Sequence, residues 1–344
     1  AELLECFDNI IGLAKAENVN VILISGDLFE HSYVKKSTII HVNQSFKKLD
    51  ETKIFITPGN HDPLIKGSYY RSFEWSENVH IIEGTESGIY LSEYGTFIYG
   101  KPFKSFYEKK SLVQGMRVSD KSCINVLLIH GTVDMGIGQK DYNPMTSAEL
   151  ESLGMDYVAL GHFHNRVEIK GRTGVAYNPG SPEPLGFDEP GRHGVYIGTI
   201  TKNEGENLPS FDIRFVETCK RFYRTIDINV SGLTSNEEIL DKIILLINRE
   251  DIGKGLYDIR LKGCTDRLFK PDTRLLQRLL NERVYFTRIK DETAADFDIE
   301  SISNEPGLKG LYVKKLLELI DSEQDQEKTA LYRLALNYGL QALE

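Results

Sequence analysis

The chain has 344 residues and a formal net charge of −10, with 40% hydrophobic and 27% charged residues. This length predicts two or three compact units, and the composition excludes a largely disordered or collagen-like polymer. The four cysteines lie at least 45 residues apart, which indicates reduced thiols in a cytoplasmic protein rather than a disulfide framework or a zinc knuckle. No apolar run approaches the ~20 residues that span a bilayer, so we expect no membrane attachment.

The chain opens within an amphipathic helix, because apolar side chains recur at helical spacing between Leu3 and Ala14. Short apolar runs then predict strands buried on both faces, as in an α/β sandwich. Four of these runs are Val21–Ile24, Lys53–Ile56, Ile124–Ile129 and Asp156–Leu160. Polar residues follow each run directly, and open α/β sheets place their ligands at the carboxyl ends of their strands.

A fifth and a sixth apolar run end the first unit, which we place at residues 1–200. The polar stretch 201–210 contains Gly and Pro and predicts a domain boundary. After it we expect a small α+β unit over residues 211–300 and a helical segment over residues 305–344. The expected later elements are strands at 211–216, 224–230 and 257–262, and helices at 237–248, 272–281, 310–320 and 326–343.

Six polar side chains follow the predicted strands of the first unit. They are Asp27, Asn60, His61, His130, His162 and His164. Carboxylate and amide oxygens beside imidazoles suit Mn, Fe or Zn, and the lack of thiolates argues against a structural zinc site. One histidine after a strand is usually an ordinary loop or core residue, but the four-part pattern indicates a site for two metal ions. Such a pair activates water and clamps both oxygens of an in-line displacement at phosphorus.

These motifs resemble those of the calcineurin-like metallophosphoesterase superfamily. They stand here as Gly26-Asp27, Gly59-Asn60-His61-Asp62, His130 and Gly161-His162-Phe163-His164. More narrowly, the chain resembles the SbcD-type DNA repair exonucleases, and among them the YhaO-type proteins. The motifs behind this narrower resemblance are Gly26-Asp27-Leu28-Phe29, Gly59 to Pro63, Trp75 with Asn78-Val79-His80, and Pro179 to Gly191 with His193-Gly194. The resemblance extends over nearly the whole chain.

The resemblance implies a four-layer α/β/β/α sandwich with nuclease activity, followed by a small α+β capping domain that binds DNA and by C-terminal helices. It also implies two divalent metal ions, with Mn favoured and Fe, Zn or Mg as alternatives. The implied metal ligands are Asp27 as the bridge, Asn60, His130 and His162 for one ion, and His164 for the other.

Two residues of the second motif have implied roles in catalysis. His61 would not bind metal, and would instead protonate or steady the leaving oxygen, which suits an imidazole that titrates near neutral pH. Asp62 would orient the ring of His61.

One departure from the family pattern concerns the first metal. The family's first motif, Asp-x-His, precedes the helix with which this chain begins, and no Asp-x-His occurs in the 344 residues. One ion would then keep only Asp27 and His164 as protein ligands. We therefore expect a chain truncated at its start, without the first strand of the domain, and a first metal site that is weak or absent.

Three further residues are candidates for substrate contact. His31 and Tyr33 lie in the loop after the Gly26-Asp27 motif, which would face the cleft, although a solvated loop fits them equally well. Ser181 ends the loop that begins at Asn178. The backbone N–H groups of this loop could bind phosphate, or the loop could be a rigid turn.

The segment Lys254–Lys290 has ten Lys or Arg against four Asp or Glu. It also contains Tyr257, Phe269, Tyr285 and Phe286. Basic and aromatic residues mixed in this way favour DNA binding by backbone contacts and base stacking, and a solvated helix face is the alternative. The next segment, Asp291–Asp325, has ten acids against three bases. Because the charge is so unevenly distributed, the net value of −10 does not exclude DNA as a partner.

Apolar residues recur at helical spacing near the C-terminus, and such stripes usually pack within their own domain. The resemblance implies instead that these helices hold an SMC-like ATPase partner, as an amphipathic helix does in a groove. It also implies a homodimer, although no residue pattern indicates the dimer surface.

The favoured function is therefore metal-dependent DNA cleavage by the exonuclease subunit of a repair complex. One alternative is a small-substrate phosphodiesterase or nucleotidase, against which the expected capping domain and the basic segment argue. The other is a non-catalytic scaffold, which the missing Asp-x-His allows and the retained His61 disfavours.

Overall fold

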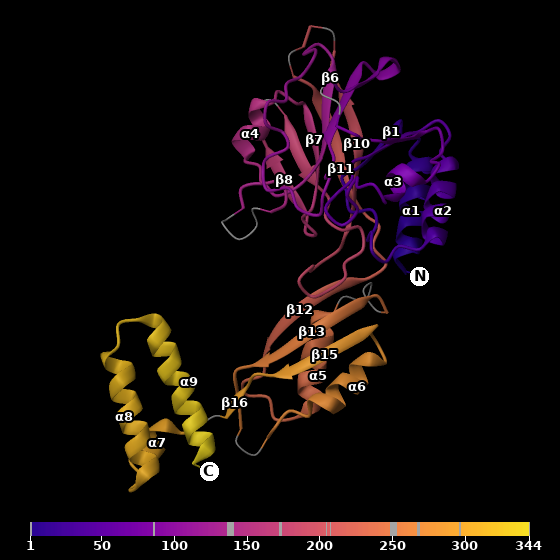
Figure 1. Ribbon diagram of the computed structural model, residues 1–344. Helices are drawn as coiled ribbons and strands as arrows, with labels where there is room; N and C mark the ends of the chain where they lie inside the picture. The colour runs from indigo at the N-terminus through magenta and orange to yellow at the C-terminus, as the bar shows by residue number, and fades with distance from the viewer. Residues whose placement is uncertain are drawn as a thin grey trace. The chain divides into compact units, whose positions relative to one another are not determined.

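Figure 1 shows the computed structural model, which describes residues 2–343 apart from 85–86, 136–140, 172–173, 204, 207, 248–252, 267–268 and 296. The chain divides into two compact units, Ala1–Phe222 and Tyr223–Glu344. All four cysteines are free thiols. None of the described helices is both long enough and apolar enough to span a bilayer.

Two sheets organise the first unit. The smaller one is parallel, in the order β1-β2-β3, and comprises β1 (Val21–Ile24), β2 (Lys53–Ile56) and β3 (Val79–Ile81). The larger one has the order β4-β5-β6-β7-β9-β8, and β5, β6, β7 and β9 run parallel. Its strands are β4 (Ile89–Leu91), β5 (Thr96–Lys101), β6 (Ile124–His130), β7 (Tyr157–Gly161), β8 (Val167–Lys170) and β9 (Val175–Asn178).

Two long helices, α1 (Glu2–Ala16) and α2 (Lys36–Lys47), cover the outer face of the smaller sheet (Figure 1). Acidic residues lie in the first turn of α1 and Lys15 lies in its last turn, which complements the helix dipole at both ends. The rings of Phe7 and Phe46 meet edge to face where the two helices pack. The buried residues of this layer include Ile11, Ile39, Phe46, Ile54 and Ile56.

A second core lies between the two sheets, and its buried residues include Phe55, Val126, Leu128 and Ala159. A third core covers the far face of the larger sheet, where Leu127 and Ile129 pack with Leu150 of α4 (Ser147–Ser152). Thr146 and Glu149 form a capping box that begins α4. The order helix, sheet, sheet, helix confirms the expected α/β sandwich. The remaining short helices of the unit are α3 (Tyr69–Ser72) and η1 (Ser92–Tyr94).

The expected domain boundary at 201–210 is wrong. The structure pairs β10 (Gly194–Thr201) with β11 (Ser210–Glu217) as an antiparallel hairpin, so this stretch is the connection within the hairpin. Ile200 of β10 and Phe211 of β11 both pack against the core between the sheets. A polar stretch with Gly and Pro is typical of a hairpin turn as well as of a linker, and the chain divides only after Phe222.

The second unit is built on a three-stranded sheet in the order β12-β13-β15, with β12 at Phe222–Asn229, β13 at Gly255–Lys262 and β15 at Phe286–Asp291. Figure 1 shows α5 (Asn236–Leu246) and α6 (Thr273–Asn281) on one face of this sheet. The end of the helix expected at 237–248 lies outside the described residues. A short parallel pair, β14 (Cys264–Thr265) and β16 (Ala294–Ala295), completes the sheet structure.

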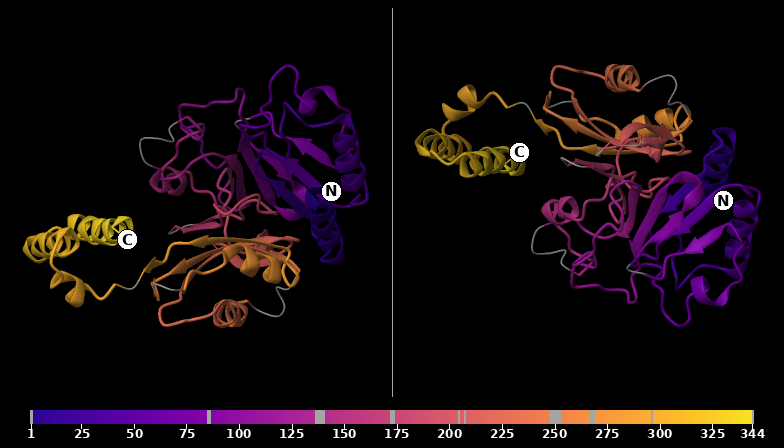
Figure 2. Two further views of the ribbon diagram at one scale, coloured as in Figure 1. Left: turned by 90° about the horizontal axis from the view of Figure 1, so that it is seen from below. Right: turned by 90° about the horizontal axis from the view of Figure 1, so that it is seen from above.

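Three helices end the chain: α7 (Ile299–Ser303), α8 (Leu308–Ser322) and α9 (Gln326–Ala342). Both views of Figure 2 show α8 and α9 side by side. Their shared core contains Val313, Leu316, Leu336 and Leu340. The hydroxyl group of Tyr312 donates a hydrogen bond of 2.6 Å to the Ala335 carbonyl and joins the two helices.

A buried carboxylate organises the basic strands of the second unit. The side chain of Asp258 on β13 is 1% exposed and accepts a hydrogen bond of 2.8 Å from Nε of Arg288 on β15. Arg260 and Lys290 approach the same carboxylate at 3.6 and 3.7 Å. The hydrogen bond with Arg288 and these neighbouring charges hold the pKa of Asp258 below its usual value.

We expect Asp258→Asn to lower the free energy of unfolding of the second unit by about 1–3 kcal/mol at neutral pH, because the charge-assisted hydrogen bond with Arg288 and the attraction of Arg260 and Lys290 are lost. The folded-state pKa lies below the unfolded value of about 4. The contribution is therefore present above that unfolded value and disappears as the pH falls through the folded-state pKa. Urea unfolding at pH values across this range measures the contribution of Asp258 to the free energy of unfolding. Hydrogen exchange of peptides from β13 and β15 assigns the change to these strands.

Asp227→Asn is the matched control, since Asp227 pairs with Lys262 at 2.7 Å but is 50% exposed. We expect this variant to change the free energy of unfolding by at most about 1 kcal/mol. A destabilisation by Asp258→Asn that persists unchanged in strong acid would contradict the electrostatic explanation.

Candidate metal centre

The polar residues that follow β1, β2, β6 and β7 meet at one end of the two sheets. Gly26 has φ 87°, and a Cβ there would lie 2.6 Å from Nδ1 of His130, so only glycine fits. Asp27 and His162 also have positive φ values, 54° and 102°, which non-glycine residues rarely adopt. Strained backbone of this kind is concentrated at functional sites, where surrounding contacts hold it.

Three of the candidate ligands form one compact cluster. Ligand atoms of Asp27, His130 and His162 all lie within 4.8 Å of one another. Oδ1 of Asn60 lies 2.8 Å from Nε2 of His130 and 3.1 Å from Nδ1 of His162. Oδ2 of Asp27 lies 3.2 Å from the same Nε2 atom. The structure thus brings together the four residues that the sequence analysis assigned to one ion.

The hydrogen bond of His130 with Ser25 shows why this cluster suits a cation. Nδ1 of His130 donates a hydrogen bond of 2.7 Å to the Ser25 carbonyl oxygen, so the neutral ring keeps a lone pair on Nε2. This lone pair points at Oδ1 of Asn60. The Nε2 atom itself lies 3.3 Å from Nδ1 of His162. Acceptors that converge in this way repel one another unless a cation lies between them. The donor set therefore fits a divalent metal ion, and the carbonyl of Ser25 orients the His130 ring for it.

The charge states of the cluster also suit a metal. Burial, together with the neighbouring His130, lowers the pKa of His162 to about 4, so its ring is neutral at neutral pH. Burial alone would raise the pKa of Asp27, but its interactions with the neighbouring imidazoles and the hydrogen bond from the His61 backbone N–H group outweigh burial and lower that pKa. A neutral imidazole and an ionised carboxylate are the forms that bind metal.

Asp62 does not touch the His61 ring, so the expected orienting role is wrong. Its carboxylate is buried and accepts hydrogen bonds from the backbone N–H groups of Gly59 (2.8 Å), Asp27 (3.0 Å) and Phe29 (3.0 Å). It also accepts one of 2.6 Å from the hydroxyl group of Tyr70. Asp62 therefore braces the loops after β1 and β2 against each other.

Glu30 takes the place that the sequence analysis gave to Asp62. Its Oε2 atom lies 2.6 Å from Nδ1 of His61, and both side chains are about half exposed. Burial alone would lower the pKa of His61, but the hydrogen bond with Glu30 and nearby carboxylates outweigh it and raise that pKa. Sequence reasoning missed Glu30 because only the fold shows that it reaches the ring of His61.

His164 lies outside the compact cluster and has its own glutamate. Nδ1 of His164 lies 2.6 Å from Oε1 of Glu189, which is buried. The other oxygen of Glu189 accepts hydrogen bonds from the Ser181 hydroxyl group (2.8 Å) and the Leu185 backbone N–H group (3.1 Å). With Nδ1 held in this way, Nε2 of His164 is the ring nitrogen available to a metal.

The three candidates for substrate contact lie in different surroundings. Ser181 uses its hydroxyl group to hold Glu189. Tyr33 is 83% exposed. The backbone N–H group of His31 donates a hydrogen bond of 3.0 Å to the His61 carbonyl, and its ring meets Phe106 edge to face. The loop after β1 therefore lies beside His61.

Comparison with known proteins supports a metal-binding phosphoesterase site in the first unit. Residues 1–166 match the family model described as Calcineurin-like phosphoesterase. The first unit therefore contains a calcineurin-like metallophosphoesterase domain, as its motifs predicted.

The chain is also similar to three named proteins. It is 29% identical over 206 residues to the uncharacterized metallophosphoesterase YhaO of Bacillus subtilis, and the match covers 57% of this chain and 49% of YhaO. It is 25% identical over 345 residues to the DNA double-strand break repair protein Mre11 of Saccharolobus solfataricus, which covers 94% of this chain and 86% of that protein. It is 26% identical over 342 residues to the DNA double-strand break repair protein Mre11 of Methanopyrus kandleri, and this match covers 88% of this chain and 70% of that protein. The chain thus spans about half the length of YhaO.

We expect Mn²⁺ to raise the midpoint of thermal unfolding of this protein, because an ion that binds only the folded state stabilises it. Free Mn²⁺ at about 100 times its dissociation constant would add about 2.7 kcal/mol. His162→Ala removes one of the converging donors and should weaken Mn²⁺ binding at least about tenfold in isothermal titration calorimetry. EDTA should reverse the stabilisation.

His41→Ala is the matched control, because His41 pairs with Asp8 at 2.9 Å on the helical layer, away from the cluster. It should bind Mn²⁺ as the unaltered chain does. Equal affinities for Mn²⁺ in the two variants would contradict the assignment of His162.

Proposed function

We propose that this protein is a metal-dependent nuclease that hydrolyses DNA phosphodiester bonds in DNA repair, with Mn²⁺ as the favoured ion. The observation that carries the proposal is that the ligand atoms of four residues converge on one point. These residues are Asp27, Asn60, His130 and His162. The similarity over most of the chain to two proteins named for DNA double-strand break repair supports DNA as the substrate.

Divalent ions held by these donors, with His164 serving a second ion, would supply Lewis-acid activation of water and neutralise charge at phosphorus. The protein's own residues supply the proton chemistry. Glu30 holds Nδ1 of His61, so Nε2 is the ring nitrogen that donates a proton to the departing sugar oxygen. In this proposal Glu30 is a positioning residue, and the 2.6 Å contact fixes the direction of the ring.

The basic segment of the second unit supports a polymeric substrate. Arg288 and Lys290 lie on β15, and the aromatic residues Tyr285 and Phe286 beside them are exposed. Tyr257, which the sequence analysis grouped with these aromatic residues, is fully buried and is not available for base stacking. Exposed basic and aromatic side chains together suit a nucleic-acid backbone with unstacked bases.

One experiment separates this function from its alternatives. The protein is incubated with Mn²⁺ and labelled double-stranded DNA, single-stranded DNA or cyclic nucleotides. DNA degradation supports the proposal, whereas turnover of cyclic nucleotides alone would support a small-substrate phosphodiesterase. DNA binding without cleavage would support a scaffold.

We expect His61→Ala to lower the rate of DNA cleavage by about 10²- to 10⁴-fold, because the proton donor is lost, and to leave Mn²⁺ affinity unchanged. Glu30→Gln should lower the rate by about tenfold through loss of ring orientation. Steady-state kinetics and Mn²⁺ titration of each variant measure both effects.

Glu93→Gln is the matched control for Glu30→Gln, since Glu93 forms an exposed ion pair with Lys53 at 3.0 Å. It should cleave DNA at the unaltered rate. If Glu30→Gln behaved in the same way, Glu30 would have no role in positioning His61.

We further propose that α8 and α9 bind an SMC-like ATPase. Their outer faces carry exposed leucines, among them Leu331 and Leu334, which are 60% and 51% exposed. Exposed apolar residues on one helix are the anchors by which such a helix docks in a groove.

Leu334→Asp should abolish co-purification with an SMC-like ATPase co-expressed from the same genome, because a charge would enter the apolar contact. Arg333→Asp also introduces an acid at an exposed position of α9 and is the control. It should leave co-purification intact. Undiminished co-purification of the Leu334 variant would rule out this docking role.

A further inference from the structure

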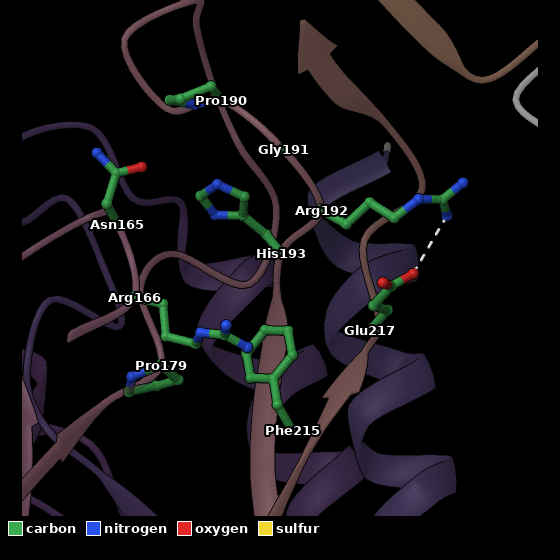
Figure 3. A pocket seen from close by; sticks show the side chains of 9 residues that line it. All are labelled: Asn165, Arg166, Pro179, Pro190, Gly191, Arg192, His193, Phe215 and Glu217. Atoms are coloured by element: carbon green, nitrogen blue, oxygen red, sulfur yellow. Dashed lines mark hydrogen bonds and ion pairs between the residues drawn. The ribbon is translucent and has the colours of Figure 1, made fainter. Parts of the chain in front are cut away.

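A pocket of about 560 Å³ lies on the first unit, beside the residues that hold His164. Figure 3 shows it between the chain after β7, the turns after β9 and before β10, and the strand β11. Its lining residues are Asn165, Arg166, Pro179, Pro190, Gly191, Arg192, His193, Phe215 and Glu217. A volume of this size is typical of small-molecule sites in proteins.

The two arginines of this pocket differ in their partners. Arg192 forms an ion pair of 3.2 Å with Glu217, drawn as a dashed line in Figure 3. The guanidinium group of Arg166 lies over the Phe215 ring, 4.7 Å from its centroid. Within the part of the chain that the structure describes, no acidic side chain forms an ion pair with Arg166. The pocket thus presents the flat guanidinium group of Arg166, and the Phe215 ring holds its orientation.

Hydrogen-bond acceptors line the same pocket. Nδ1 of the buried His193 lies 2.7 Å from the Ser181 carbonyl oxygen and donates to it, so the neutral ring keeps Nε2 as an acceptor. The side-chain amide nitrogen of Asn165 donates to the Asp188 carbonyl, which leaves the amide oxygen free to accept. The carboxylate of Glu217 adds further acceptor atoms.

This combination of groups suits a nucleobase better than a bare anion. A base has flat faces that stack on guanidinium groups and aromatic rings, and ring N–H or exocyclic amino groups that donate hydrogen bonds. Pro179, Pro190 and Phe215 supply apolar walls. A carboxylate such as Glu217 repels phosphate, but it accepts hydrogen bonds from a base.

The pocket is connected to the candidate metal centre through the chain itself. Asn165 directly follows His164, and Pro190 directly follows Glu189, which holds the His164 ring at 2.6 Å. A group bound here would therefore lie close to His164, the proposed ligand of the second ion.

We propose that this pocket binds one unpaired base of the substrate strand, stacked on the guanidinium group of Arg166 with Phe215 behind it. The proposal rests on the proposed DNA-cleaving function and adds a subsite for a base. Strand ends and single strands offer such a base without the cost of breaking a base pair.

The test measures equilibrium binding in EDTA, so that neither metal nor cleavage contributes. The probes are a fluorescent single-stranded oligothymidine and an abasic chain of the same length, which carries the same phosphates without bases. Arg166→Ala should weaken binding of the oligothymidine about tenfold and binding of the abasic chain much less, because base stacking on a side chain contributes on this scale. Phe215→Leu should act in the same direction, because it removes the ring that holds the guanidinium group.

Arg214→Ala is the matched control. Arg214 precedes Phe215 on β11, carries the same charge and pairs with Glu17 at 2.7 Å away from the pocket. It should bind both probes as the unaltered chain does. Thermal unfolding by circular dichroism confirms that each variant is folded.

The outcomes separate this subsite from the proposed function. An equal loss for both probes in Arg166→Ala would mean a site for phosphate alone, and no loss would mean no subsite at all. Either result overturns the inference, even if the unaltered chain cleaves DNA with Mn²⁺. Failure of the unaltered chain to cleave DNA would instead contradict the proposed function.

Discussion

The candidate metal centre depends on the hydrogen bonds of one buried carboxylate. Asp62 accepts hydrogen bonds from three backbone N–H groups and from the hydroxyl group of Tyr70 on α3, and the three backbone donors come from both loops that carry the ligands. An ionised carboxylate is costly to bury unless its oxygens are hydrogen-bonded, so the two loops are held in one arrangement. Asp27 and Asn60 belong to these loops, and their side chains meet the histidines of the larger sheet only while this arrangement holds.

Two histidines at the edge of the site share a second constraint. His61 and His164 each have Nδ1 held at 2.6 Å by a glutamate, Glu30 in one case and Glu189 in the other. Because the direction of an imidazole ring decides which nitrogen can act, these two glutamates determine what each histidine can do. Glu189 also lies between the metal centre and the neighbouring pocket, so the same contact relates the two sites.

Sequence reasoning succeeded for β1, β2, β6 and β7, because each of these strands is a nearly continuous apolar run. It missed β3, β4, β5 and β8, which are short or mix polar with apolar residues and carry no comparable signal. It also misread 201–210, since a polar stretch with Gly and Pro is compatible with either a linker or a hairpin. The pairing of β10 with β11 decides between them.

The sequence by itself determined which chemical groups follow the buried strands, because apolar runs and the motifs after them are local patterns. Only the tertiary structure decided the partner of each group. The contacts of His61 with Glu30, His164 with Glu189 and His130 with the Ser25 carbonyl join residues 31, 25 and 105 positions apart. No local periodicity specifies such contacts, since they arise where separate loops and strands pack together, and for the same reason the assignment of Asp62 to the ring of its neighbour was wrong.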